Sequence, residues 1–600
     1  MDVRRNSLGN SKSPYLRQYA AHPVWWQEWT PEVLQAAADT DTILFVSVGY
    51  SSCRSCHAML ADTFAHPSVE QLLNRHCISI KVDSEQRPDI TQYLSDFMLT
   101  TNGAVSWPIN VFLSPDLKPF FSFTYAPPFS TTQSRGLIEM LPQILAFYYQ
   151  NAQRLSHFIV DRNQAMESAA QENDPLQSIA NYFDAKNGGF GSGSKLPPFS
   201  TLLFLFYQRS CQPTAQIDTM ITHTLNAMAC GGLQDHVNGG FFRYCTDPGW
   251  KTPHFEKLLI DQAMQLWVYS LAEHSFPDRG YREVANGILR TLECDFRIGS
   301  AYRSAINADV DGVAEASALW TAEQLAETLD TNQRKTINRS FKFIEMEHQP
   351  DYYHLIRTAP LSSVSKEEKL LLQHMRNSSN LRQQPLLDYT ILTNANCLVG
   401  AAMVIASRCL RIPQLLHRAG ELFFFIDRTM RTDKTLIHSV IGSFRSTQTF
   451  AYDAAAFTLL ADLLYEHNFA LQPHYEAAYS TLQPFHTDES TWVESANPDF
   501  FALPASSFDY PYPSTLGLIY LVHTRHSLRS NNMHSSPRFL PGIQQDFANI
   551  ARLIQHGDFF TIYTHHELSH DHMPINSIVV PATSPHVCIE GECCNEEMLL

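Results

Sequence analysis

The chain has 600 residues, which is too long for one hydrophobic core and indicates about two to four domains. Hydrophobic residues make up 44% of it and charged residues 17%, a composition typical of an ordered globular protein and not of a disordered one. With 43 basic and 60 acidic side chains the net charge is −17, which argues against binding to nucleic acid or to an anionic membrane.

Targeting segments and cysteine usage indicate the compartment. The N-terminal residues contain no apolar core of signal-peptide length, and no later run approaches the roughly 18 apolar residues of a membrane span. The 12 cysteines are scattered and form no disulfide framework. We therefore expect a cytoplasmic protein whose partner is a protein dithiol or disulfide, or a small-molecule substrate.

The first part of the chain alternates predicted strands and helices. Aromatic residues dominate a lead-in at 13–29, and their rings are expected to pack on the domain that follows. Apolar or alternating patterns predict strands at 42–48, 77–83, 109–113 and 118–125. Helices are expected at 31–38, 58–64, 67–74 and 89–99. The order β-α-β-α-β-β is that of a thioredoxin-like fold.

Two cysteines follow directly after the first predicted strand. Residues 49–57 read Gly-Tyr-Ser-Ser-Cys-Arg-Ser-Cys-His, so Cys53 and Cys56 form a C-x-x-C motif behind a short turn. If a helix begins at Cys53, both sulfurs meet at its N-terminus, where partial positive charge favours a thiolate. We predict that Cys53 is the more exposed, attacking thiolate, assisted by the charge of Arg54, and that Cys56 is the resolving thiol.

The same residues allow a second interpretation. C-x-x-C-H is also the attachment sequence of c-type haem, which needs an oxidising compartment and a haem pocket. The strand, turn and helix context favours a dithiol, and we expect no cofactor.

Pro108 stands at the start of the third predicted strand. Proline cannot donate to the sheet ladder, and in a thioredoxin-like fold the proline at this point is typically cis and faces the dithiol. We therefore predict a cis Trp107–Pro108 bond and include Pro108 among the catalytic residues.

The pattern changes near residue 150. Apolar residues then recur at helical spacing for most of the chain, and strand-like segments are few and short, which indicates a helical toroid or solenoid. The polar stretch 359–384 is expected to be a loop. The predicted domains are a thioredoxin-like domain at 1–160, an α/α toroid at 161–560 and a C-terminal segment at 561–600.

Several motifs together resemble one family. The chain resembles the spermatogenesis-associated thioredoxin-like proteins, which join a thioredoxin-like domain to an (α/α)6 toroid related to six-hairpin glycosidases and to N-acylglucosamine 2-epimerase. The resemblance covers nearly the whole length and is carried by residues 13–16, 49–57, 80–89, 107–113, 188–191, 231–244 and 253–261. It implies a fold that is multidomain, α/β plus all-α. The better-known thioredoxins keep a buried acid six positions before the first cysteine as a proton acceptor, and here that position is Ser47.

The toroid offers a second group of candidate residues. Acids, bases and cations lie close together in a glycine-rich stretch and the helix entry after it, and toroids of this type line a central funnel with such residues. Carboxylate and histidine pairs are what sugar epimerisation or glycoside hydrolysis requires. The alternative is that these groups satisfy one another and cap helices. The substrate-binding candidates are Asp235, His236, Arg243, Tyr244, His254, Glu256, Lys257 and Asp261.

Other motifs depart from the family or stand alone. The family pattern D-A-D-S-E-G-x-E-G-x-F-Y-x-W is altered at 307–320, where the second glutamate and both aromatics are missing. A family-type sugar activity is therefore expected to be weakened or lost. A literal H-E-x-x-H occurs at 566–570, but it follows a strand-like run and stops at Pro574, so we predict no metal site.

The sequence predicts a thiol–disulfide oxidoreductase or redox sensor acting through the dithiol. The alternative is a carbohydrate-binding or carbohydrate-active toroid that the thioredoxin-like domain accompanies. A third possibility is an interaction scaffold without catalysis.

Overall fold

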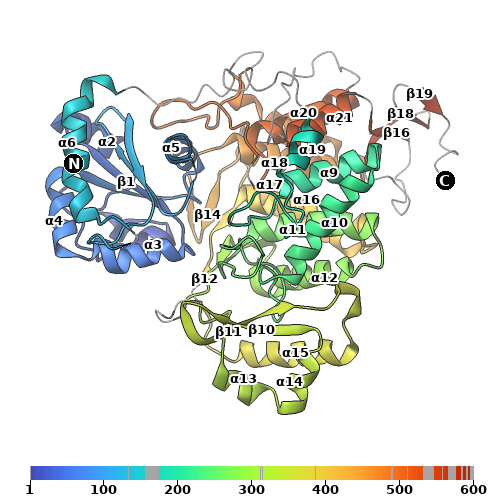
Figure 1. Cartoon of the computed structure of the whole chain (residues 1–600). Coiled ribbons are helices and arrows are strands. Elements are labelled where there is room, and N and C mark those ends of the chain that lie inside the picture. Colours follow the sequence, from blue (N-terminus) through green and yellow to red (C-terminus); the bar gives the residue numbers. More distant parts are fainter. Residues whose placement is uncertain are drawn as a thin grey trace. The chain divides into compact units, whose positions relative to one another are not determined.

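The structure is a computed structural model of the 600-residue chain, and the chain forms two compact units (Figure 1). One unit combines Met1–Asp161 with two later segments, His438–Gln448 and Val493–Pro504, and the other holds the remainder. No helix among the described residues is long and apolar enough to cross a membrane. The structure describes residues 2–103, 105–132, 134–155, 174–310, 313, 315–385, 387–487, 491–509, 511–530, 546–556, 558–564, 576–582, 585–589 and 592–594.

A four-stranded sheet in the order β2-β1-β3-β4 forms the centre of the first unit. Strand β1 pairs parallel with β2 and antiparallel with β3, and β4 pairs antiparallel with β3. The strands are β1 (Leu44–Gly49), β2 (Ile78–Asp83), β3 (Ile109–Leu113) and β4 (Pro119–Phe123). The thioredoxin-like fold predicted from the order of elements is confirmed.

Helices cover both faces of this sheet. Strand side chains alternate between the faces, so Phe45 packs with residues of α3, α4 and α6, whereas Val46 packs with residues of α2 and α5. Pro31, Pro67 and Pro88 occupy first-turn positions, where the missing N–H costs no hydrogen bond. The helices are α2 (Pro31–Thr40), α3 (Arg54–Met59), α4 (Pro67–His76), α5 (Pro88–Asn102) and α6 (Leu137–Asn151).

The aromatic lead-in belongs to the core of the first unit, as predicted. It contains the short helix α1 (Pro14–Arg17), which Ser13 caps by accepting a hydrogen bond from the backbone of Leu16 at 3.1 Å. The Ser13 hydroxyl also donates to Asp83 Oδ2 at 2.5 Å, at the end of β2. The lead-in is therefore bound to the end of the sheet from which the dithiol loop leaves β1.

Segment Val493–Pro504 is joined to the first unit by buried charges and rings. Arg87 Nη2 lies 2.8 Å from Asp89 Oδ2 and 2.6 Å from Asp499 Oδ1, and all three side chains are at most 12% exposed. The ring of Phe501 lies 4.9 Å from that of Tyr93 on α5. Residues some 400 positions apart thus share one core, which sequence patterns did not indicate.

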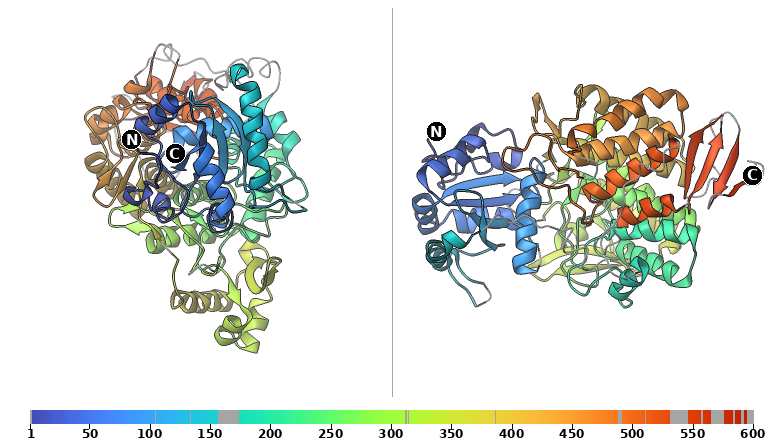
Figure 2. Two further views of the ribbon diagram at one scale, coloured as in Figure 1. Left: turned by 90° about the vertical axis from the view of Figure 1, so that its left-hand side faces the viewer. Right: turned by 90° about the horizontal axis from the view of Figure 1, so that it is seen from above.

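Paired helices form the second unit (Figure 2). Helices α11, α16, α18 and α20 contact one another in that order, and α21 contacts α9, which in turn contacts α11. These contacts close a ring, and the α/α toroid predicted from the sequence is confirmed. The pairs are α9 (Phe199–Cys211) with α10 (Ala215–Cys230), α11 (Leu259–Ser275) with α12 (Tyr281–Thr291), α16 (Thr393–Cys409) with α17 (Gln414–Thr429), α18 (Ala451–Tyr465) with α19 (Gln472–Ser480), and α20 (Thr515–Arg529) with α21 (Asp546–Gln555), and α8 (Pro175–Tyr182) precedes them.

An insertion between α12 and α16 corrects two expectations. Residues 359–384, expected to be a loop, contain the helix α15 (Lys366–Asn380), and strands β10 (Phe341–Met346) and β11 (Gln349–Arg357) form a longer hairpin than the sequence suggested. Ser365 and Glu368 form a capping box at the start of α15, a signal that the polar composition obscured. Figure 1 shows α13 (Ala322–Thr328), α14 (Thr331–Ile337) and α15 together beside β10 and β11.

Short strands complete the second unit. The C-terminal sheet has the order β17-β16-β18-β19. The H-E-x-x-H sequence at 566–570 lies outside the described residues. The remaining strands are β5 (Lys257–Leu258), β6 (Arg297–Ile298), β7 (Ala301–Tyr302), β8 (Ala305–Ile306), β9 (Trp320–Thr321), β12 (Leu387–Asp388), β13 (Ile391–Leu392), β14 (Ser439–Ile441), β15 (Phe444–Arg445), β16 (Phe560–Thr564), β17 (Ser577–Pro581), β18 (His586–Ile589) and β19 (Glu592–Cys594), of which β14 and β15 belong to the first unit.

Replacing Arg87 tests the buried charge cluster. Arg87→Met should lower the free energy of unfolding by about 3 kcal/mol, because it leaves the carboxylates of Asp89 and Asp499 buried without their cation. Lys118→Met removes the more exposed ion pair with Asp116 and should cost less than about 1 kcal/mol. Urea unfolding of both variants measures the difference, and equal losses would contradict the assignment.

Candidate functional site

The two cysteines of the C-x-x-C motif form a disulfide at the start of α3. Their sulfurs are 2.03 Å apart, and Cys53 is the N-cap residue, whose Sγ accepts a hydrogen bond from the backbone N–H of Cys56 at 3.2 Å. A sulfur in this position faces the positive end of the helix dipole, which stabilises a thiolate after reduction. The predicted pairing of sulfurs at a helix N-terminus is therefore present.

The exposure expected for Cys53 is not found. Its side chain is 1% exposed and that of Cys56 is 0% exposed. Both belong to the hydrophobic cluster that contains Tyr15, Tyr50 and Phe45. The aromatic lead-in, which the sequence pattern could not place against the motif, contributes to this burial. Exchange with a target therefore requires movement of side chains around Cys53.

Pro108 follows a cis peptide bond, as predicted. Its neighbour Trp107 packs edge-on against Tyr50, with the ring centroids 4.9 Å apart. Tyr50 precedes the C-x-x-C turn, so this contact joins the loop that carries the cis proline to the loop that carries the dithiol.

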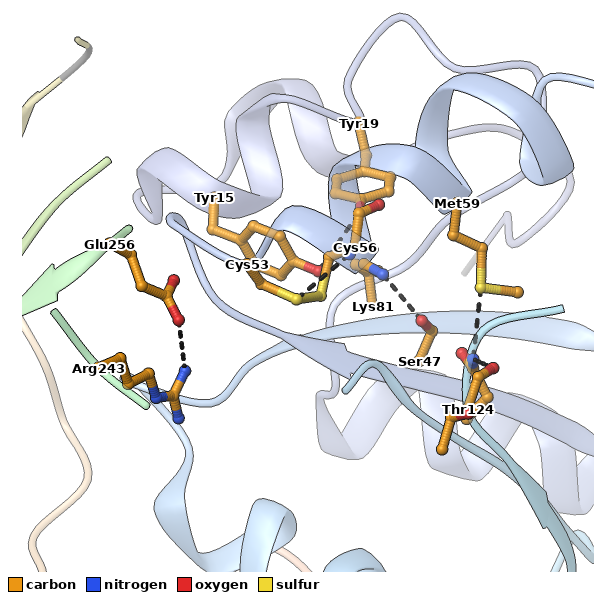
Figure 3. The surroundings of a disulfide bond; sticks show 11 residues. Tyr15, Tyr19, Ser47, Cys53, Cys56, Met59, Lys81, Thr124, Arg243 and Glu256 are labelled. Atoms are coloured by element: carbon orange, nitrogen blue, oxygen red, sulfur yellow. Dashed lines mark hydrogen bonds and ion pairs between the residues drawn. A yellow bond between two sulfur atoms is a disulfide. The ribbon is translucent and has the colours of Figure 1, made fainter. Parts of the chain in front are cut away.

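A row of buried polar residues crosses the centre of the sheet on the face that α3 covers. Ser47 on β1 pairs with Lys81 on β2 and with Asn110 on β3. Their exposures are 0%, 1% and 0%. Lys81 Nζ donates to Ser47 Oγ at 2.8 Å, and Asn110 Nδ2 donates to the backbone oxygen of Thr124 at 2.8 Å (Figure 3). Polar groups in this position have no water to bind, so each depends on its neighbour.

Lys81 is an amine held among aromatic rings. Its Nζ lies 4.4 Å from the ring centroid of Tyr19 and 5.4 to 5.5 Å from those of Tyr15, Trp26 and Phe64. Among the described residues no carboxylate forms an ion pair with it. Burial lowers the pKa of Lys81 well below its ordinary value. Burial thus opposes the charged form of the amine, whereas the faces of the four rings favour it.

Two tyrosines connect the lead-in to Cys56. The Tyr19 hydroxyl donates to the backbone oxygen of Cys56 at 3.3 Å and lies 3.3 Å from the Tyr15 hydroxyl. A Cβ added at Gly49 would come within 2.1 Å of the Tyr15 hydroxyl and 2.7 Å of Cys56 Sγ. A side chain at position 49 would clash with both atoms, so only glycine fits there. The Tyr15 hydroxyl and Cys56 Sγ both border Gly49. Burial raises the pKa of Tyr15, so the phenol keeps its proton.

Three of the toroid candidates hold a loop together. Lys257 Nζ lies 2.8 Å from Asp235 Oδ2 and donates to the backbone oxygen of Gly239 at 2.8 Å. Asp235 also accepts hydrogen bonds from the backbone of Val237 and Asn238. The His236 ring contacts the Gly231 backbone oxygen at 2.9 Å, and burial lowers its pKa to about 4. For these residues the structure agrees with the interpretation that they satisfy one another.

The other toroid candidates include groups that could take part in proton transfer. Arg243 Nη1 lies 3.1 Å from Glu256 Oε1. The Tyr512 hydroxyl donates to Asp261 Oδ1 at 2.6 Å, and burial raises the pKa of Asp261 to about 7 in spite of that hydrogen bond and of the charge of Arg243. The rings of Tyr244 and His254 are stacked 4.3 Å apart. Among the described residues no group of three or more His, Cys, Asp or Glu could hold a metal ion.

Sequence patterns missed Lys81, Asn110 and Tyr512 as site residues. Lys81 could have been found, because a lysine at an inward position of the apolar run 78–82 is unusual and strand alternation places it on the face of Ser47. Tyr512 reaches Asp261 across 251 positions, and no local pattern signals such a contact.

This geometry defines the class of the first unit, which is a thioredoxin-like domain with a C-x-x-C disulfide and a cis proline whose neighbour Trp107 contacts Tyr50. Residues 5–168 match the Thioredox_DsbH family, described as "Protein of unknown function, DUF255". The chain is homologous to spermatogenesis-associated protein 20, with 36% identity to the rat protein over 351 residues (54% of this chain, 44% of the rat protein) and 37% identity to the human protein over 325 residues (51% and 41%). The resemblance found in the sequence is confirmed, but the alignments cover about half of this chain, and not nearly its whole length as expected, and less than half of those relatives.

Solved structures with a likeness to the chain include sugar-processing enzymes. Cellobiose 2-epimerase from Spirochaeta thermophila has 13% identity and a TM-score of 0.40, over 69% of this chain and 86% of that one. An unsaturated glucuronyl hydrolase specific for heparin has 13% identity and a TM-score of 0.33, over 79% and 98%. The assignment of the toroid rests on the helix contacts described above.

Replacing Lys81 should change the pH dependence of stability. The unfolded chain keeps the lysine proton up to a pH of about 10, whereas the folded protein releases it at lower pH, so the unfolded state binds more protons in this window. Stability due to this group therefore rises with pH up to about 10. Lys81→Met should raise the free energy of unfolding at pH 7 by about 1 kcal/mol and flatten its pH dependence.

Thermal unfolding between pH 6 and pH 9 measures this effect. Lys12→Met, at an exposed lysine of the same unit, is the control and should leave both stability and slope unchanged. A Lys81→Met variant that loses stability at pH 7 and keeps the slope of the parent would show that Lys81 is charged in the folded protein.

Proposed function

We propose that the protein is a thiol–disulfide oxidoreductase that exchanges electrons with a target through Cys53 and Cys56. The single observation that carries this proposal is the disulfide at the N-terminus of α3, with Cys53 as the N-cap residue. The cis bond before Pro108 and the contact of Trp107 with Tyr50 support it, because they bring a docking strand to the same loop. The target is a protein disulfide or a small-molecule disulfide.

In the reducing direction the exchange takes two steps. The Cys53 thiolate attacks one sulfur of the target disulfide, forms a mixed disulfide and releases the other target sulfur as a thiolate, which takes a proton from water. Cys56 then loses its proton and attacks Cys53, which releases the second target thiolate and forms the Cys53–Cys56 disulfide. The target gains two electrons, and an external dithiol restores the reduced cysteines.

Lys81 is proposed as the proton acceptor for the second step. The position of the usual acid is held by Ser47, which has no basic group, but Ser47 binds an amine whose pKa burial lowers. Taking the Cys56 proton would convert this amine to an ammonium ion beside a new thiolate, so the two charges stabilise each other. The neutral phenols of Tyr15 and Tyr19 offer further hydrogen bonds near Cys56.

A disulfide reductase assay on the full chain tests the proposal, with dithiothreitol as reductant and a model disulfide as target. Cys53→Ser should abolish turnover, because the attacking sulfur is missing. Cys56→Ser should stop at the mixed disulfide, which mass spectrometry detects as a covalent adduct. Lys81→Met should form the adduct at the normal rate but resolve it more slowly, by roughly tenfold or more.

Turnover that is the same in Cys53→Ser as in the parent protein would refute the oxidoreductase proposal. Normal resolution in Lys81→Met would refute only the proton-acceptor assignment. Cys77→Ser is the matched control, since Cys77 is a buried free thiol of the same unit and should not affect turnover.

A second function, acid–base chemistry on a carbohydrate in the toroid, is favoured by Asp261. A carboxyl whose pKa is raised to about 7 can donate a proton at neutral pH, and the same stretch supplies a second carboxyl group, that of Glu256, which is paired with Arg243. Epimerases and glycosidases need such a pair, in which one group donates a proton and the other accepts one. The altered motif at 307–320 counts against efficient turnover of a typical family substrate.

Asp261→Asn tests this second function. It keeps the hydrogen bond from Tyr512 but cannot donate the proton, so any epimerase or glycosidase activity should fall by about a hundredfold or more. The parent activity should decline as pH rises through about 7, because Asp261 then ionises. Assays with a panel of disaccharides and monosaccharides measure both effects, and activity that persists in Asp261→Asn would exclude Asp261 as the acid.

A further inference from the structure

A cavity of about 310 Å³ lies in the second unit. Its walls come from α12, from the π-helical turn Leu292–Phe296 that follows it, from α15 of the insertion, and from the loop that Asp235 and Lys257 hold together. Phe255 and Lys257, the two neighbours of Glu256 in the sequence, line it, whereas Glu256 and Asp261 do not.

Cations outnumber acids around this cavity. Lys257, Arg290, Arg303 and Arg376 line it, against Asp235 and Asp295. Lys257 and Asp235 neutralise each other, so three arginines face one remaining carboxyl. In a chain with a net charge of −17, such a local excess of positive charge is unusual and favours an anion.

The surroundings of Asp295 and Arg376 add to the excess of positive charge around the cavity. Burial raises the pKa of Asp295, which weakens it as a counter-ion. Arg376 donates two hydrogen bonds to the backbone oxygen of Val237, at 2.8 and 2.6 Å. Burial and the nearby charge of Arg290 lower the pKa of Arg376. The arginines repel one another in the absence of an added negative charge.

Arg303 has a buried guanidinium group that lacks hydrogen-bond partners among the described residues. It stands between β7 and β8, is 9% exposed, and its Nε and Nη1 are buried with no hydrogen-bond partner among the described residues. The Tyr389 ring lies against it, with the ring centroid 4.6 Å from the guanidinium carbon, and the charge of Arg303 acts on the nearby carboxyl of Asp295. Leaving two N–H groups of a cation unsatisfied in the interior is costly, and an oxyanion relieves this cost by accepting both.

The rest of the lining suits hydroxyl groups. Asn238 Oδ1 is a third buried atom of the lining without a partner among the described residues, and it can accept a hydrogen bond from a hydroxyl. The other polar side chains that line the cavity are Asn307, Ser317, Ser379, Asn380 and Gln384. The volume is at the lower end of the range for small-molecule sites, which fits a ligand of about monosaccharide size.

We propose that this cavity binds a small hydroxylated organic anion, with the phosphate or carboxylate group on Arg303 and Arg290 and the hydroxyl groups on Asn238 and its polar neighbours. The chemistry that Arg303 recognises is shared by sugar phosphates and sugar acids, since guanidinium binds either oxyanion with paired N–H groups. The proposal rests on neither the dithiol reaction nor the Asp261 reaction.

Isothermal titration calorimetry with the full chain tests this proposal, with glucose 6-phosphate, glucuronate, glucose and inorganic phosphate as probes. We expect glucose 6-phosphate or glucuronate to bind more tightly than both glucose and inorganic phosphate. Arg303→Met should abolish this binding, and Arg290→Gln, at an exposed position on α12, should weaken it by roughly tenfold.

The controls separate binding from folding. Arg428→Gln changes an exposed arginine on the outer helix α17 that does not line the cavity, and it should bind as the parent does. Because Arg303 has unsatisfied N–H groups, Arg303→Met should keep the thermal midpoint of the unliganded parent or raise it. If Arg303→Met does not fold, Arg290→Gln alone decides the question.

Two results would overturn the proposal. One is the absence of tighter binding by either sugar anion than by glucose and inorganic phosphate at millimolar concentration. The other is affinity that is the same in Arg290→Gln and in Arg303→Met as in the parent protein.

Discussion

The hydrogen bond from Lys81 to Ser47 is the contact around which the first unit is organised. It places an amine in the middle of a sheet face that is otherwise apolar, where an uncompensated charge would be very costly. The protein surrounds it with four aromatic rings, three of which come from the lead-in. The same lead-in also reaches the disulfide, because the Tyr19 hydroxyl donates to the backbone oxygen of Cys56 and lies 3.3 Å from that of Tyr15.

A common physical feature marks each place where chemistry or binding is proposed. Lys81, Asp261 and Arg303 are all buried; Lys81 has no carboxylate partner among the described residues, and Asp261 and Arg303 each keep buried polar atoms without a hydrogen-bond partner there. The buried charges of Asp462 and Arg525, by contrast, are paired with one another and serve the fold. Burial alone is thus a poor guide to function, and burial with incomplete pairing is a better one.

Local patterns predicted much of the first unit because its strands are short, apolar and separated by clear turn signals. The dithiol and the cis bond before Pro108 could be expected, because each of them depends on a single short stretch of sequence. The insertion was harder. Helix α15 exposes most of its surface and carries many polar residues, so its apolar stripe is narrow, and only its capping box signalled its start. Segment Val493–Pro504 could not have been assigned to the first unit, since its link to Arg87 spans 412 positions.

The sequence by itself determined the order of strands and helices, the C-x-x-C motif before a helix, and the change to a helical toroid, because each depends on periodicity or spacing within a few tens of residues. Only the tertiary structure decided what those residues do. It placed Lys81 behind the dithiol in the absence of the usual acid, separated loop-holding Asp235 and Lys257 from Asp261, and gathered arginines from three elements around one cavity. These outcomes depend on burial and on pairing between distant residues, and those properties exist only after the chain has folded.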